Sequence, residues 1–329
     1  MGLATLAATF VILVRLARLD ARGCWLLAVL FVASGPLQYS VKEGNTSHIV
    51  LLALAGGLAL ARANRSVAAG AALAAAAIVK PPLLLFGGFF LMRGDLRGAA
   101  AFCGAITAAA GLSVAVFGWG ENVFWFQTCI LQFGHRWLGA FNVQSITGFL
   151  MRLEPGPPGL VDWNVYAPSA ADRVVDFAAA GLLYAVAAAA WAAALLRPPA
   201  QRRPSGTDRL DFQYALVLAL AVVSSPLSWS HYYCWFLVPT ALFLGAAQDA
   251  APLAWRWLGA LAIALVTPLV WPFPLSGPAQ EIYRMFLVSN LLFGGLLWFA
   301  LTVWRLAGAG PDPRLPAIRP EIAPVPFRS

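Results

Sequence analysis

Long apolar stretches, separated by short polar ones, account for most of the chain. They cover residues 2–14, 24–41, 45–61, 66–79, 82–92, 98–118, 173–196, 211–227, 231–247, 255–271 and 285–304. A helix needs roughly 20 apolar residues to cross a bilayer, so most of these runs predict spanning helices, whereas 66–79 and 82–92 are too short to span alone. We expect an all-α polytopic membrane protein of about nine or ten transmembrane helices or half-helices, forming one domain over residues 1–307.

Composition agrees with this pattern and excludes other classes. Of the 329 residues, 60% are hydrophobic and 11% are charged, against about 25% charged in soluble domains. Arginine at cytoplasmic helix ends explains the net charge of +8, because the basic patches with interleaved aromatics of a nucleic-acid-binding protein are not visible. The cysteines and histidines show no metal-ligand spacing. We expect no metal, no cofactor and no nucleic-acid partner.

The arginines set the orientation of the runs. Sixteen of the 22 basic residues fall in every second loop between the apolar runs or in the C-terminal tail. The positive-inside rule assigns these segments to the cytoplasm. Because Arg62 and Arg93 then share a side, residues 66–92 must enter the membrane and return, as two half-helices that turn at Lys80-Pro81-Pro82. The alternative is a single proline-kinked helix, which would place Arg93 outside.

This orientation gathers five polar segments on the outer face: 40–47, the turn at Lys80, 119–172, 225–232 and 272–284. The aromatic-rich stretch 122–141 favours a helix lying in the membrane interface, and 154–168 is a Pro/Gly-rich loop. The tail 308–329 is rich in proline and predicts a disordered cytoplasmic segment. The first apolar run is short and precedes its positive charges, unlike a signal peptide, so we expect the chain to begin partway through a helix.

Lys80 is the strongest candidate for a functional residue. The chain has 20 arginines but only two lysines, Lys42 and Lys80, and both fall on the outer side. A lysine at the C-terminal end of a helix can simply cap the helix carbonyls or extend to the interface. The functional interpretation is a point charge that binds a phosphate at the membrane surface.

Two further polar stretches open apolar runs on the same face. In SSPLSWSHYYCW (224–235), Trp229 fits the ordinary aromatic belt, but a histidine beside it, His231, is less routine. In FNVQSITGFLMRL (141–153), helix capping and loop solvation are the structural interpretation of the polar side chains. The remaining candidates on this face are Lys42, Glu43, Asn45, Arg136, Asn142, Gln144, Ser145, Arg152 and Ser228.

These stretches resemble glycosyltransferase family 87. Residues 43–86 resemble that family's helix start, basic loop, small-residue helix and Lys-Pro; 142–153 resembles its Asn-x-x-Ser-x-x-Gly-x-x-x-Arg stretch. Residues 224–239 are similar to its Ser-Pro-x-Ser-Trp-x-His signature, which is the most specific of the three. The resemblance covers about residues 45–240.

The resemblance implies a GT-C-type membrane glycosyltransferase, typified by mannosyltransferases that use polyprenyl-phosphate-mannose in cell envelope biosynthesis. Such enzymes work on the outer face of the plasma membrane, pass the sugar to a lipid or glycan acceptor and invert the anomeric centre. Lys80 and His231, with Arg136 and Lys42 behind them, would stabilise the charge on the leaving phosphate. Asn142, Gln144 and Ser145 would hold sugar hydroxyls, and Trp229 would pack against the sugar or the prenyl chain. Asn45, Arg152 and Ser228 complete the expected donor site.

One departure keeps other interpretations open. The general base of this superfamily is normally an aspartate in the first outer loop, whereas the first aspartate here, Asp20, lies among cytoplasmic arginines. Either the chain is truncated, or Glu43 substitutes as base, or the protein is an inactive homologue. A transporter or flippase of lipid-linked sugars is a further alternative, although transporters more often carry polar groups at the midplane of two related halves.

Overall fold

A computed structural model of the chain describes residues 2–132, 136–153, 160–196, 206–246, 252–273 and 277–308. Every regular element in these ranges is a helix, and two isolated β-bridges join irregular segments. By length and hydropathy, three described helices are able to cross a membrane, or four if a bent pair counts as one span, and five shorter apolar segments accompany them. The predicted all-α membrane architecture is confirmed. The tail expected at 308–329 lies, apart from Gly308, outside the described residues.

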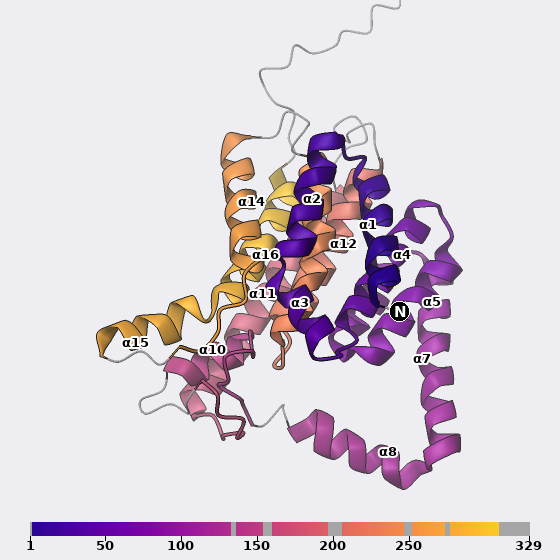
Figure 1. Cartoon of the computed structure of the whole chain (residues 1–329). Helices are drawn as coiled ribbons and strands as arrows, with labels where there is room; N and C mark the ends of the chain where they lie inside the picture. Colours follow the sequence, from indigo (N-terminus) through magenta and orange to yellow (C-terminus); the bar gives the residue numbers. More distant parts are fainter. Residues whose placement is uncertain are drawn as a thin grey trace, which may run out of the picture.

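The bundle is built from helices of two stretches of the chain, which pack against each other (Figure 1). The first comprises α1 (Gly2–Ala17), α2 (Ala21–Ala33), α3 (Gly35–Lys42), α4 (Ser47–Arg62), α5 (Ser66–Val79), a 3₁₀ turn (Pro81–Leu84), α6 (Leu85–Met92) and α7 (Leu96–Phe117). The second comprises α11 (Ala170–Leu196), α12 (Gly206–Val223), a 3₁₀ turn (Ser230–Phe236), α13 (Leu237–Ala246), α14 (Leu253–Val266) and α16 (Asn290–Gly308). At the lower end in Figure 1 lie α8 (Trp119–Trp125) with a π-helical turn (Phe126–Leu131), α10 (Ile146–Leu153), and α15 (Pro278–Ile282) with a second π-helical turn (Tyr283–Leu287).

The predicted hairpin at residues 66–92 is confirmed. α5 ends at Val79, Lys80 is extended, and Pro81 begins the 3₁₀ turn that leads into α6. Both arms pack on the start of α7: a Cβ at Gly70 of α5 would collide with the carbonyl oxygen of Gly98, and a Cβ at Gly98 would collide with the ring of Phe90 on α6. Small residues allow this close helix approach. A single kinked helix is therefore excluded, and the Lys80 turn lies at the far end of α5 from Arg65.

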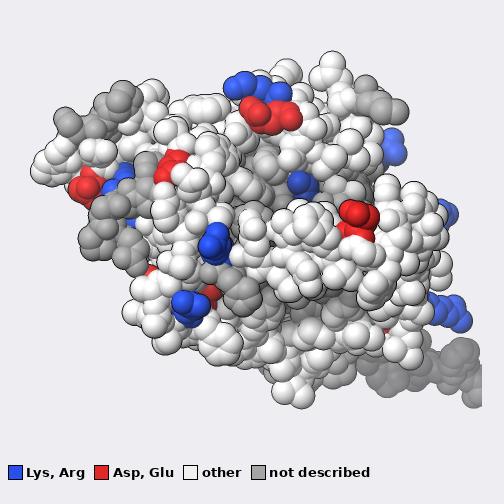
Figure 2. All heavy atoms as spheres, turned by 90° about the horizontal axis from the view of Figure 1, so that it is seen from below, with Lys and Arg blue, Asp and Glu red and all other residues white. Residues whose placement is uncertain are grey.

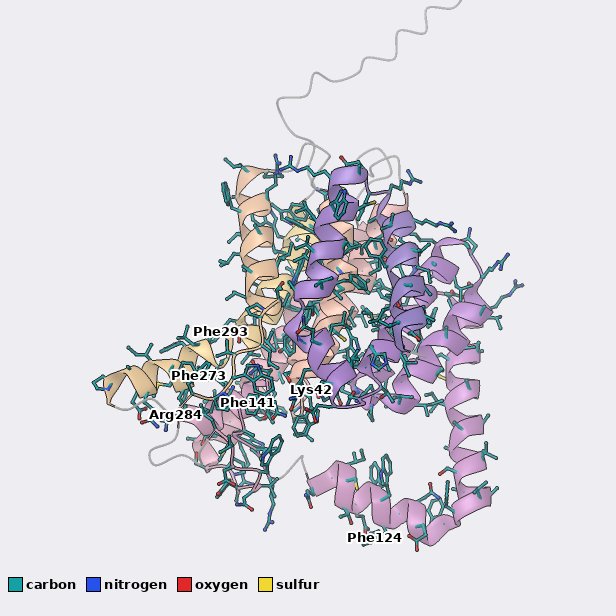
Figure 3. The ribbon with its side chains drawn as sticks, viewed as in Figure 1. Lys42, Phe124, Phe141, Phe273, Arg284 and Phe293 are labelled. Atoms are coloured by element: carbon teal, nitrogen blue, oxygen red, sulfur yellow. The ribbon has the colours of Figure 1, made fainter. Side chains whose placement is uncertain are left out.

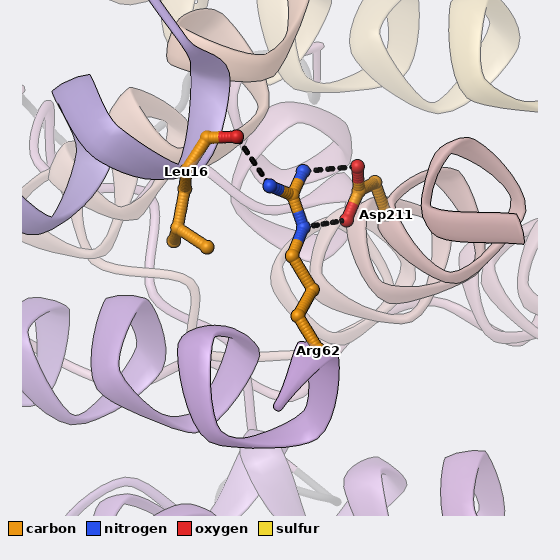
Figure 4. A network of polar contacts seen from close by, with 3 residues as sticks. All are labelled: Leu16, Arg62 and Asp211. Carbon is orange, nitrogen blue, oxygen red and sulfur yellow. Dashed lines mark hydrogen bonds and ion pairs between the residues drawn. The ribbon is translucent and has the colours of Figure 1, made fainter. Parts of the chain in front are cut away.

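The ends of α4 and α6 are held to α12 by arginines, and Figure 4 shows the contacts of Arg62 at the end of α4. Arg62 Nε donates to Asp211 Oδ1 at 2.6 Å, a second guanidinium nitrogen bonds the other carboxylate oxygen, and the third donates to the carbonyl oxygen of Leu16. Arg93 donates to the side-chain oxygen of Gln213. Because both arginines reach the same stretch of α12, they lie on one side of the bundle, as the arginine pattern predicts.

Replacing Asp211 with asparagine should destabilise the bundle by roughly 1.5–3 kcal/mol, the net value of hydrogen bonds to charged groups. The guanidinium of Arg62 would keep one acceptor but lose its carboxylate partner. Chemical unfolding of the purified protein in detergent measures the change. Glu121→Gln, at an exposed position on α8, is the control and should leave the free energy of unfolding within about 0.5 kcal/mol of the wild type.

Two predicted helices differ in the structure. The apolar run 24–41 is broken at Ser34, whose hydroxyl accepts from the backbone N–H of Leu37, and α2 and α3 meet there at 48°. The interfacial helix expected over 122–141 begins at Trp119, and its described helical turns run to Gln132. From Trp137 to Ser145 the chain is buried and non-helical, so that part of the prediction is wrong. Buried irregular backbone needs polar partners from the protein, and these are described below.

Candidate functional site

Most of the candidate residues meet at the end of the bundle opposite Arg62 and Asp211. This end carries the Lys80 turn, the segment 136–145, the 3₁₀ turn after Trp229 and the C-terminal end of α3. Figure 2 shows it directly: the Lys and Arg residues and the Asp and Glu residues are few and scattered among uncharged ones. The individual cations placed here therefore have few neighbouring charges of either sign.

Lys80 is held in a defined position by two neighbours. Its Nζ donates to Asn45 Oδ1 at 3.1 Å and lies 4.8 Å from the ring centroid of Tyr232. Asn45 Oδ1 also accepts from the backbone N–H and hydroxyl of Ser47, at the start of α4. The side chain is only 8% exposed. Since an ammonium has three N–H donors, one hydrogen bond and one ring contact leave donor capacity for a bound anion.

His231 lies beside Lys80 in a setting of aromatic rings. Its ring centroid lies 6.3 Å from that of Trp229 and 6.4 Å from that of Tyr39, in stacked orientations, and 5.1 Å from that of Tyr232. Both ring nitrogens are buried and have no hydrogen-bond partner among the described residues. Buried polar atoms are normally paired, so His231 retains hydrogen-bonding capacity that the described residues do not use.

More unpartnered polar atoms surround His231. The segments 142–144 and 228–230 run side by side: Gln144 N–H donates to the Ser228 carbonyl at 2.6 Å, and Ser230 N–H donates to the Asn142 carbonyl at 2.7 Å. Within the described structure, the side-chain oxygens of Asn142 and Ser230 are buried and accept or donate no hydrogen bond, and the buried Ser228 hydroxyl lies near the Tyr233 hydroxyl. The Asn142 amide contacts the Tyr39 hydroxyl at 3.5 Å. These groups and His231 form one polar cluster.

Lys42 and Glu43 lie at the C-terminal end of α3, and Figure 3 shows Lys42 on the same side of the bundle as Phe141. Their charged groups are 3.8 Å apart and both are largely exposed. Lys42 Nζ also lies 5.1 Å from the ring centroid of Trp271, which contacts Phe141 and Tyr39. Tyr39 in turn stacks on His231, so the pair Lys42–Glu43 is connected to the cluster through aromatic rings.

Arg152, Gln144 and Ser145 are buried and bonded to the protein itself. Arg152 donates to the carbonyls of Gly139, Ala140 and Val143 and to the Ser289 hydroxyl. The Gln144 amide donates to two carbonyls, those of Phe141 and Val288, and the Ser145 hydroxyl accepts from Gly148 N–H. A direct contact with substrate would require these bonds to break. Their hydrogen bonds stabilise the irregular segment 137–145.

Arg136 is not brought into the cluster: its side chain is exposed and its backbone N–H donates to Gln132. Sequence reasoning missed several residues that the structure adds, namely Tyr39, Trp163, Ser230, Tyr232 and Trp271. Trp163 belongs to the Pro/Gly-rich loop and Tyr39 to an apolar run, so neither carries a sequence signal for a binding site. Among the described residues, no group of three His, Cys, Asp or Glu side chains is arranged to hold a metal ion.

An apolar groove adjoins the Lys80 turn. It has a volume of about 630 Å³ and is lined by Pro81, Pro82, Leu84, Leu85, Cys129, Ile130, Tyr184, Ala221, Ser224, Ser225, Pro226, Leu227, Trp229 and Tyr232. Two of these residues, Trp229 and Tyr232, also contact His231, and the Tyr232 ring lies against Lys80. The groove and the polar cluster therefore share a wall. Volumes of this size are typical of small-molecule sites.

Comparison with known proteins identifies the family. No curated protein and no solved structure matches the chain significantly. The sequence model of glycosyltransferase family 87 matches residues 1–226, which is well over half of the chain. The match begins earlier than the span of 45–240 expected from the motifs, and it ends at Pro226, before Trp229 and His231. The chain belongs to glycosyltransferase family 87 and is a membrane-embedded glycosyltransferase.

Proposed function

We propose that the chain transfers a sugar, mannose in the first instance, from a polyprenyl-phosphate-sugar donor to a lipid or glycan acceptor. The reaction takes place at the outer face of the plasma membrane and inverts the anomeric centre. The observation that carries this proposal is the position of Lys80, a buried cation whose contact residue Tyr232 also lines an apolar groove. A cation next to an apolar groove suits a ligand with a phosphate head and a hydrocarbon chain.

The surroundings of the groove favour a membrane lipid as its occupant. Its walls include the π-helical turn after α8 and the exposed side of α11. α7 and α11 are long apolar helices that bury little of their surface in the bundle, so this side of the protein faces lipid. A prenyl chain would lie in the groove, and its phosphate would reach the ammonium of Lys80.

The cluster supplies the groups that a single displacement needs. The acceptor oxygen bonds to the anomeric carbon as the bond from that carbon to the phosphate oxygen breaks, and the electron pair stays on the phosphate. Lys80 and an N–H of His231 stabilise that charge, because donors fixed in a low-dielectric site need no reorganisation. The acceptor's proton passes to a general base, for which Glu43 is the candidate. One displacement inverts the centre.

Lys80→Ala tests the donor site. We expect the donor KM to rise about 10–100-fold, which corresponds to the loss of one hydrogen bond to a charged group. The measurement is transfer of labelled mannose from polyprenyl-phosphate-mannose by the full chain in lipid nanodiscs. Arg97→Ala, an exposed arginine at the opposite end, is the matched control and should behave as wild type.

Two results would contradict the proposal. One is an unchanged donor KM in Lys80→Ala, which would remove the phosphate role of this lysine. The other is movement of labelled donor lipid across vesicles without any glycosidic product, which would favour a flippase.

A further inference from the structure

Trp163 occupies an unusual position for an exposed tryptophan. It lies in the loop 160–168, and its side chain is 52% exposed. Its ring stacks on Trp229, with centroids 6.1 Å apart and planes inclined by 23°. Trp229 in turn stacks on His231. Trp163 is thus the exposed end of a row of rings that leads to the polar cluster.

The loop that carries Trp163 is anchored on both sides. The carboxylate of Asp162 accepts from the backbone N–H and side-chain amide of Asn164 and from the Tyr166 hydroxyl, at 2.6–2.9 Å. The Tyr166 bond lowers the pKa of Asp162, so the carboxylate stays ionised at neutral pH. Tyr166 also forms a two-bond bridge with Trp137, and the Phe141 N–H donates to the Leu160 carbonyl. The indole is therefore held in place before any ligand arrives.

Anchoring of a polypeptide in the lipid interface is the ordinary role of an exposed tryptophan. Trp119 and Trp125 on α8 fit that role: both are exposed, and neither takes part in any ring contact described for this structure. Trp163 differs, because it is fixed against a ring that borders the reaction site. An exposed, rigid aromatic face beside a polar cluster is the arrangement that binds the apolar C–H face of a pyranose, with its hydroxyls left to neighbouring polar groups.

We propose that Trp163 is the platform on which the acceptor's sugar stacks, so that the acceptor substrate carries a pyranose next to the hydroxyl that is glycosylated. This inference rests on the proposed function. In the proposed function the donor's chain lies in the apolar groove, which Trp229 lines, whereas Trp163 is the exposed ring stacked on Trp229 and lies beside the exposed Asn164. A hydrophilic acceptor sugar suits the exposed side. Trp163 binds and orients substrate; it takes no part in bond making.

Trp163→Ala should raise the KM for a mannoside acceptor about tenfold, as expected for loss of one stacking contact. kcat and the donor KM should each change less than about twofold, and Trp163→Tyr should recover most of the acceptor affinity. The measurement is the transfer assay in nanodiscs with methyl α-mannopyranoside as acceptor. Trp119→Ala is the matched control and should behave as wild type.

A second measurement does not depend on turnover. Saturation-transfer NMR of methyl α-mannopyranoside with the full chain should show transfer to the ring C–H protons in the wild type and in Trp119→Ala, but not in Trp163→Ala. If Trp163→Ala alters neither this signal nor the acceptor KM, while Lys80→Ala still weakens donor use, the platform is refuted and the proposed function stands. If no lipid donor is used at all but the signal depends on Trp163, the sugar platform stands without that function.

Discussion

Replacing His231 with phenylalanine is expected to lower kcat for sugar transfer about 10²–10³-fold, the usual cost of removing one preorganised donor to a developing anion. Both ring nitrogens lack partners among the described residues, so the substitution leaves no described protein group without its hydrogen bond. A phenyl ring keeps the contacts with Trp229 and Tyr39. The loss of activity would therefore report on the substrate and not on the fold.

His231→Gln makes this experiment more specific, because the glutamine amide supplies N–H donors of similar reach. It should recover part of the lost kcat, whereas His231→Phe should not. Thermal unfolding of both variants in detergent is expected to lie within a few degrees of the wild type. A wild-type kcat in His231→Phe would show that the imidazole has no role in the chemistry.

The sequence predicts those features of the fold that follow from the positions of the arginines and the lengths of the apolar runs. Arginines mark cytoplasmic helix ends, and because Arg62 and Arg93 must lie on one side, the turn at Lys80 follows without knowledge of any tertiary contact. The structure confirms this through α12, which both arginines contact. Proline at the start of a helical turn loses no hydrogen bond that the helix would make, which explains why Pro81 is accommodated there.

Irregular backbone inside the bundle was not predictable in the same way. Residues 137–141 are apolar and aromatic-rich, and a local pattern of this kind does not distinguish an interfacial helix from a buried extended segment. The difference is made by partners distant in sequence, such as Val288 and Ser289, which bond Gln144 and Arg152. The bend between α2 and α3 likewise depends on the cap at Ser34, inside an otherwise continuous apolar run.

Some residues of the candidate site are likewise predictable from the sequence, and others are not. Lys80 and His231 are polar residues that adjoin apolar runs, and Asn45 belongs to the polar segment 40–47, so the sequence draws attention to all three. The structure places Asn45 and Lys80 in contact. Tyr39, Tyr232 and Trp163 carry no such signal, because aromatic residues are common at membrane interfaces. Only the ring-to-ring geometry around His231 distinguishes them.

Arg152 explains how the site tolerates a buried irregular segment. Its side chain is fully buried, and one guanidinium nitrogen donates to three carbonyls of residues 139–143 while another donates to Ser289. Those carbonyls belong to the backbone that pairs with the Ser228–Ser230 segment next to His231. Each buried acceptor that loses its partner costs roughly 1–3 kcal/mol. The arginine therefore stabilises the backbone on which the polar cluster is built.

Arg152→Ala should consequently destabilise the protein by roughly 3–5 kcal/mol, because several buried acceptors lose their donor at about 1–3 kcal/mol each while the cost of burying the charge is removed, and should abolish transfer. Arg152→Lys should rescue little, because a single ammonium lacks the planar fork that reaches two sets of acceptors at once. Chemical unfolding in detergent measures the stability, and limited proteolysis should cut residues 136–153 in the variants before the wild type. Arg136→Ala, an exposed arginine in the same stretch, is the control for stability and should change it by less than about 0.5 kcal/mol. A stable, protease-resistant Arg152→Ala protein without activity would instead assign this arginine to the substrate.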